Sequence, residues 1–98
     1  MTTQQLELKA NKIRQDIIEM LIAAGSGHTA GPLGMADVLA TLYFEVLRHD
    51  PKNPSWKERD RLVLSNGHIV PVQYAAMAES GYLPRAELTS LRSFGSRL

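Results

Sequence analysis

The sequence predicts part of an α/β protein, in which helices surround a strand that needs partners. Apolar residues recur at helical spacing in several segments. One short apolar run, Leu62–Leu64, lies between charged residues and a Ser-Asn-Gly turn, as a buried parallel strand would. A lone buried strand leaves its backbone N–H and C=O groups unpaired, which is unfavourable. We therefore expect the chain to be part of a longer polypeptide, or to add its strand to a partner subunit.

Composition narrows the possible functions. The chain has 98 residues, 44% of them hydrophobic and 21% charged, with a formal net charge of +1. This balance is typical of globular proteins and gives no electrostatic reason to expect nucleic acid or an anionic membrane as partner. The absence of Cys excludes disulfides, thiolate zinc sites and a Cys nucleophile. No apolar stretch is long enough for a membrane span, and the polar N-terminus does not resemble a signal peptide, so we expect a cytoplasmic protein.

The first predicted element is an amphipathic helix over residues Thr3–Ala24. Thr2 or Thr3 is suited to cap its start, and Gly25 to end it in the left-handed conformation. Its apolar residues are spaced three or four apart and so share one face, namely Leu6, Ala10, Ile13, Ile17, Leu21 and Ala24.

The remaining elements follow from glycine, proline and apolar spacing. Residues 25–34 contain four glycines and a proline, which predicts an irregular loop. Residues 49–61 are rich in proline and charge and predict an exposed connection. Three further helices are expected, at about Met35–Arg48, Ile69–Ser80 and Pro84–Ser93.

Two loops place a histidine directly after a glycine. The first contains His28, and the second contains His68 between the predicted strand and the next helix. Ligands of open α/β sheets bind beyond the carboxyl end of a strand, where a helix N-terminus favours phosphate. His68 is therefore a candidate phosphate-binding residue, and His28 a second candidate site residue. The alternative is that both loops are ordinary turns with exposed histidines.

Other chemically interesting residues favour structural roles. His49 lies in the polar connection and is interpreted as solvated. The spacing of the three histidines matches no metal-binding motif, so no metal site is expected among them. Tyr43 and Trp56 are interpreted as packing residues, and the run Arg59–Arg61 as a solvated or ion-paired turn.

The order of the motifs resembles the N-terminal part of transketolases. Ser26–Asp37 is similar to their S-G-H-P-G-x-x-L-x-x-A signature, and Arg59–His68 to R-D-R-F-V-L-S-x-G-H. Asp50–Trp56 resembles the D-P-x-N-P-x-W connection between them. Gly81-Tyr82 and the Gly-Ser-Arg of 95–97 match later family motifs. Deoxyxylulose-phosphate synthases share a looser version of this pattern.

The resemblance implies a thiamine diphosphate enzyme that moves a two-carbon ketol unit from a ketose phosphate to an aldose phosphate. By position, His28 matches the family's catalytic histidine near the thiazolium, and His68 matches the histidine that contacts the cofactor diphosphate. The implied fold is the thiamine-diphosphate-binding fold, a parallel sheet flanked by helices. Residues 1–98 would be the opening helical part of its diphosphate-binding domain, with one strand. Magnesium or another divalent cation is implied as well, with ligands outside this chain.

Two features qualify the comparison with this family. Thr29-Ala30 replaces the usual Pro-Gly after the first histidine. The family's magnesium-binding segment and its activating glutamate are absent, so the remainder of the enzyme or a C-terminal subunit is expected as a partner, in a homodimer or a heterotetramer. The alternatives are a helical interaction module without catalytic role, a deoxyxylulose-phosphate-synthase-like fragment, and an unrelated phosphate-binding domain.

Overall fold

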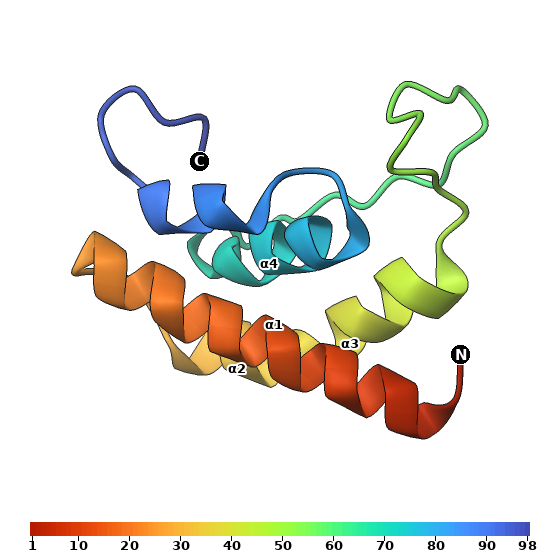
Figure 1. Cartoon of the computed structure of the whole chain (residues 1–98), viewed down its shortest axis with the longest axis horizontal. Coiled ribbons are helices and arrows are strands. Elements are labelled where there is room, and N and C mark those ends of the chain that lie inside the picture. The colour runs from red at the N-terminus through yellow and green to blue at the C-terminus, as the bar shows by residue number, and fades with distance from the viewer.

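The computed structural model describes residues 1–98 as a helical unit organised around one long helix (Figure 1). Helix α1 (Thr3–Ala24) runs along the length of the molecule. It packs against α3 (Ala36–Thr41), α4 (Pro71–Ser80) and the 3₁₀ helix η3 (Arg85–Ser90). None of the helices is both long and apolar enough to cross a membrane.

The predicted bounds of α1 are confirmed, and both caps are formed by the expected chemistry. The backbone N–H of Gln5 donates to Thr2 Oγ1 at 3.1 Å, while the Thr2 N–H donates to Gln5 Oε1 at 2.8 Å. This reciprocal capping box satisfies two N–H groups that the first turn leaves free. At the other end Gly25 adopts φ +69°, and its N–H donates to the Leu21 carbonyl at 2.9 Å.

The stretch after α1 is more regular than the sequence predicts. Residues Ala30–Gly34 form a short helix, α2, where a wholly irregular loop is expected. Pro32 is compatible with this helix because it lies in the first turn, where backbone N–H groups have no intrahelical acceptor. The Leu33 N–H donates to the Thr29 carbonyl at 3.0 Å and closes the turn.

The predicted helix over Met35–Arg48 is present in two parts. Helix α3 passes directly into a π-helical turn, η1 (Leu42–Val46). In that turn the Leu47 N–H donates to the Leu42 carbonyl, five residues earlier, at 2.8 Å. The extra residue makes the turn wider than an α-helical one.

The C-terminal helices also follow the prediction with altered ends. A 3₁₀ turn, η2 (Gly67–Ile69), precedes α4, which ends at Gly81 with φ +109°. The helix predicted at Pro84–Ser93 is shorter and is the 3₁₀ helix η3 rather than an α-helix.

The core lies where the apolar face of α1 meets the other helices. The α1 residues Ala10, Ile13 and Ile17 are buried, as their spacing predicts. One continuous cluster of 14 residues forms this core: Ala10, Ile13, Ile17, Met20, Leu21, Ala36, Leu39, Ala40, Val72, Ala75, Ala76, Leu83, Leu88 and Leu91.

The predicted parallel sheet with helices around it is wrong for this structure, because none of residues 1–98 is in a strand. The predicted strand Leu62–Leu64 is irregular, and the Val63 side chain is 87% exposed. No other segment pairs with their backbone groups in a ladder, and Leu62 instead packs its side chain against the helical core. Only the helical part of the predicted fold class is present.

One charged group is buried inside the helical unit. The Asp16 side chain on α1 has no solvent exposure, and Arg85 Nε donates to its Oδ1 at 2.5 Å. Its Oδ2 is buried without a hydrogen-bond partner. Glu79 of α4 has an 11% exposed side chain, and its Oε2 lies 3.6 Å from Arg85 Nε. Burial and the neighbouring Asp16 carboxyl raise the pKa of Glu79 to about 7. The three residues join α1, α4 and η3.

Candidate functional site

The two histidines that follow glycines lie next to each other. The ring centroids of His28 and His68 are 5.1 Å apart, with an angle of 71° between the ring planes. His28 lies in the loop between α1 and α2, and His68 lies in η2 just before α4. Both side chains are exposed. Two residues that are distant in the sequence thus form one surface feature.

A close packing contact brings the two loops together. Gly31, in the first turn of α2, faces Ile69, which follows His68 and is 6% exposed. A Cβ atom built on Gly31 would lie 2.6 Å from Ile69 Cγ2, a distance that a real Cβ cannot tolerate. Glycine at this position therefore permits the approach that places His28 beside His68.

A third residue, Arg92, contacts the His28 loop. Arg92 Nη1 donates to the carbonyl of Ser26 at 3.1 Å and lies 3.3 Å from Ser26 Oγ. No local pattern in the sequence points to this arginine, because its partner is 66 residues away. The signals available were its position just before the Gly-Ser-Arg motif and the glycine-rich nature of the loop it contacts.

The residues around the two rings are hydrogen-bond donors. The backbone N–H groups of Gly27, His28, Gly67 and His68 have no acceptor within the protein. Together with imidazole N–H groups, such donors suit an oxygen-rich anion, and the arrangement fits the diphosphate of a cofactor. For a divalent cation the structure offers no comparable cluster, because no group of three or more His, Asp or Glu side chains gathers in residues 1–98.

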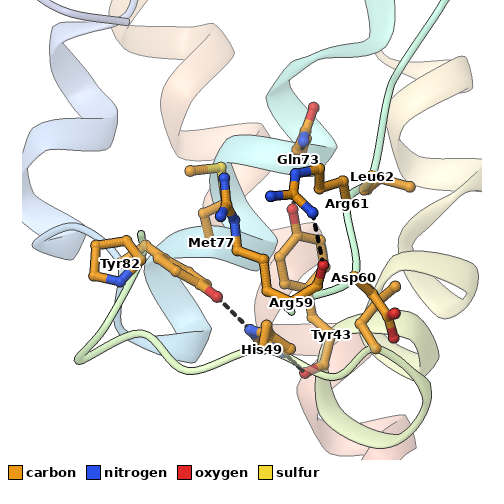
Figure 2. A pocket seen from close by; sticks show the side chains of 11 residues that line it. Tyr43, His49, Arg59, Asp60, Arg61, Leu62, Gln73, Met77 and Tyr82 are labelled. Atoms are coloured by element: carbon orange, nitrogen blue, oxygen red, sulfur yellow. Dashed lines mark hydrogen bonds between the residues drawn. The ribbon is translucent and has the colours of Figure 1, made fainter. Parts of the chain in front are cut away.

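A separate pocket of about 220 Å³ is lined by residues of η1, α4 and the connection between them, and contains neither of these histidines (Figure 2). His49, Tyr43 and Tyr82 form one wall. The prediction that His49 is solvated is wrong, because its side chain is half-buried and both ring nitrogens are hydrogen-bonded. Nε2 donates to the Tyr43 carbonyl at 2.6 Å, and Nδ1 bonds the Tyr82 hydroxyl. Its ring also stacks on that of Tyr82.

Most polar side chains of this pocket are already hydrogen-bonded, either to one another or to backbone carbonyls. Burial raises the pKa of Tyr43, partly offset by a hydrogen bond from Gln73, and burial also raises the pKa of Tyr82. Arg59 and Arg61 donate to backbone carbonyls of the same connection. The pocket thus fixes the connection to the helices. Its lining consists of Tyr43, Leu47, His49, Pro54, Arg59, Asp60, Arg61, Leu62, Gln73, Met77 and Tyr82.

The interpretation of Arg59–Arg61 as a solvated or ion-paired turn agrees with the contacts of Asp60. Arg48 Nη2 lies 2.9 Å from Asp60 Oδ1, and the Arg48 N–H donates to Asp60 Oδ2 at 2.7 Å. The hydrogen bond from Arg48 lowers the pKa of Asp60. Tyr43 packs against the core, as the sequence predicts.

Comparison with known proteins places this chain in a family. Residues 5–98 match the family described as "Transketolase, thiamine diphosphate binding domain". The chain is 47% identical over 100 residues to the 6-deoxy-6-sulfo-D-fructose transketolase subunit of Clostridium sp. strain MSTE9, covering all of this chain and 36% of that protein. It is 44% identical over 98 residues to the transketolase of Mus musculus, covering 97% of this chain and 15% of that enzyme.

A bacterial relative agrees. Transketolase 1 of Escherichia coli is 44% identical over 89 residues, which cover 90% of this chain and 13% of that enzyme. The chain thus spans about a third or less of the relatives named here. With nearly its whole length matched, the chain belongs to the transketolase family, of which it represents an N-terminal segment.

Proposed function

We propose that this chain takes part in the thiamine diphosphate-dependent transfer of a two-carbon ketol unit from a ketose phosphate to an aldose phosphate. The observation that carries the proposal is the pairing of His28 and His68, whose rings lie 5.1 Å apart and whose loops carry backbone N–H groups without an acceptor in the protein. When bound, the cofactor supplies the carbanion chemistry, while the protein binds and orients the reactants.

The two histidines have different roles in this proposal. His68 donates an imidazole N–H to a diphosphate oxygen, next to the free N–H groups of Gly67 and of its own backbone. His28 lies on the reactive side, where it hydrogen-bonds a substrate hydroxyl and stabilises charge as the C–C bond breaks. Thr29 adopts helical φ and ψ of −99° and −44°. The backbone after His28 therefore passes straight into α2, and the start of this helix sets the orientation of the His28 side chain.

The other parts of the enzyme are proposed to lie in further polypeptide, within an incomplete diphosphate-binding domain over residues 1–98. The Clostridium relative is named as a subunit, which supports a divided enzyme, in a homodimer or a heterotetramer. Magnesium or another divalent cation is proposed as the second cofactor, with ligands supplied by the remainder of the enzyme and by the cofactor phosphates. A cytoplasmic location and a role in pentose phosphate metabolism complete the proposal. A sugar sulfonate donor is a second candidate substrate, favoured by the name of the Clostridium relative.

The test uses the complete enzyme that contains this chain. His68→Ala removes a charge-assisted hydrogen bond to diphosphate, worth about 1.5–3 kcal/mol, so cofactor affinity should fall roughly 10- to 150-fold. His28→Ala should lower kcat at saturating cofactor by about 100-fold, or about 3 kcal/mol, with little change in cofactor affinity. Calorimetric titration and steady-state kinetics with phosphate and sulfonate donors measure both effects.

His49→Ala is the matched control, because it removes a histidine outside the pair. It should lower the melting temperature through its lost bonds to Tyr43 and Tyr82 while leaving cofactor affinity unchanged. Wild-type cofactor affinity in His68→Ala, together with wild-type kcat in His28→Ala, would show that both histidines are only turn residues.

A further inference from the structure

The loop that carries His28 has little support of its own. No backbone hydrogen bond joins residues 26–28 to one another or to the helices on either side. The connection that the structure does provide comes from Arg92, near the other end of the chain. Its Nη1 donates to the Ser26 carbonyl at 3.1 Å and lies 3.3 Å from Ser26 Oγ. One guanidinium therefore contacts both polar oxygens of the residue two positions before His28.

The next residue, Gly27, is enclosed by the same side chain. Gly27 adopts φ +124°, and a Cβ built on it would lie 3.0 Å from Arg92 Nη1 and 2.6 Å from Leu21 Cδ2. The loop backbone thus runs between the guanidinium and the end of α1, with no space for a side chain. A guanidinium is planar and presents its donors in a fixed arrangement. Contacts on two successive residues consequently restrict the direction in which the chain enters His28.

Arg92 itself is held in an unusual state. It is the one non-glycine residue with positive φ, at +60°, and its N–H donates to the Leu98 carbonyl at 3.0 Å. None of the ion pairs in the protein includes it. A left-handed backbone is unfavourable for a residue with a Cβ, and such strain is found where function requires a particular geometry. The strain here places an unpaired guanidinium against the His28 loop.

We propose that Arg92 is a positioning residue for His28: its hydrogen bonds to Ser26 and its contact with Gly27 hold the loop that aims the imidazole. This inference rests on the proposed function of His28. Arg92 acts through the loop, because the hydrogen bonds of its guanidinium go to Ser26, whereas an arginine that held the diphosphate would change cofactor affinity when removed. Its removal should therefore lower kcat rather than cofactor affinity.

The experiment measures kcat, KM and the cofactor dissociation constant of three variants of the complete enzyme. Arg92→Ala should lower kcat by about 10- to 100-fold, because a small misplacement of a catalytic group has an effect of this size. Cofactor affinity should stay within about threefold of wild type, a change of under 1 kcal/mol, because the Arg92 guanidinium bonds the His28 loop. Arg92→Gly, which removes the guanidinium and relieves the strained backbone, should lose as much kcat. Arg92→Lys, which keeps the charge without the planar donors, should also be impaired. Wild-type kcat in Arg92→Ala, Arg92→Gly or Arg92→Lys would overturn the proposal.

A double-mutant cycle separates this proposal from the one it rests on. In the His28→Ala background, Arg92→Ala should have no further effect on kcat, because the side chain that it positions is gone. If the two losses multiply, Arg92 acts independently of His28 and the inference is wrong. If His28→Ala alone has wild-type kcat, the proposed function of His28 fails instead. Arg97→Ala is the control, because Arg97 comes from the same segment but bonds only Glu87, at 2.8 and 2.6 Å.

Discussion

Replacing Glu79 by Gln should stabilise the helical unit at neutral and alkaline pH and leave its stability unchanged in acid. Glu79 and Asp16 are two carboxyl groups that share one arginine, Arg85, at the junction of α1, α4 and η3. Of the charged groups facing Glu79, Arg85 and Lys12 lower its pKa, but burial and Asp16 outweigh them. The amide of Gln is neutral at all pH values, and its NH₂ offers a donor near the unpaired Asp16 Oδ2.

The direction of the pH dependence follows from the raised pKa. Glu79 titrates at about 7 in the folded protein instead of 4.5. Between those values the unfolded chain has lost this proton and the folded one retains it, so stability falls as pH rises. The shift corresponds to at most about 3–4 kcal/mol, since each pKa unit is worth about 1.4 kcal/mol. Screening by solvent around the partly exposed Arg85 reduces this to an expected gain of about 1–2 kcal/mol for Glu79→Gln above pH 7.

The assay is urea unfolding of the chain, followed by circular dichroism, at several pH values between 4 and 9. The difference in unfolding free energy between Glu79→Gln and wild type should be near zero below pH 4.5 and constant above pH 7. Taking the difference cancels the opposite contributions of Asp60 and Glu87, whose pKa values are lowered by arginine partners. Glu19→Gln is the control, because its 60% exposed side chain lies 3.5 Å from the same arginine. A pH-independent difference, or an equal gain in Glu19→Gln, would refute the reasoning.

Three further substitutions test the packing and the caps. Ile17→Ala removes a fully buried core side chain and should lower the unfolding free energy by about 2–5 kcal/mol in the same urea titration, with Ile18→Ala, 45% exposed, as the milder control. Gly31→Ala should push η2 away through Ile69, so cofactor affinity of the complete enzyme should fall; an unchanged dissociation constant would mean that the two loops move apart without consequence. Thr2→Ala removes the capping box and should lower the unfolding free energy by about 1 kcal/mol, with hydrogen exchange increasing only in the first turn of α1.

The sequence predicts helices well where capping and apolar spacing agree. In α1 the threonine cap, the buried face and the terminal glycine are all local signals, and its bounds are confirmed. Glycine and proline content alone does not indicate α2, because Pro32 lies in a first turn, where a helix tolerates proline. The prediction of a strand at Leu62–Leu64 is wrong for a different reason. Its residues suit a strand, but strand formation depends on partners that no local signal supplies.

In the candidate site, too, features signalled by neighbouring residues are predictable, and contacts between residues distant in the sequence are not. His28 and His68 were singled out from the glycine beside each of them, and the structure brings their rings together. Their roles remain predictions. The interpretation of His49 as solvated is wrong because its sequence neighbours are polar, whereas its partner Tyr82 lies 33 residues away. No local signal indicates the role of Arg92, because its contact with the loop is equally non-local.

The π-helical turn of η1 has a consequence for how this segment tolerates changes of length. Its Leu42-to-Leu47 hydrogen bond encloses one residue more than an α-helical turn does. Deleting a single residue there leaves an ordinary α-helical turn, with the core residues of α3 unmoved before it and the connection containing His49 in register after it. A deletion within α3 would instead rotate everything beyond it by about 100° and turn Leu39 or Ala40 away from the core. Natural variants that differ by one residue in this region should therefore differ at Leu42–Val46.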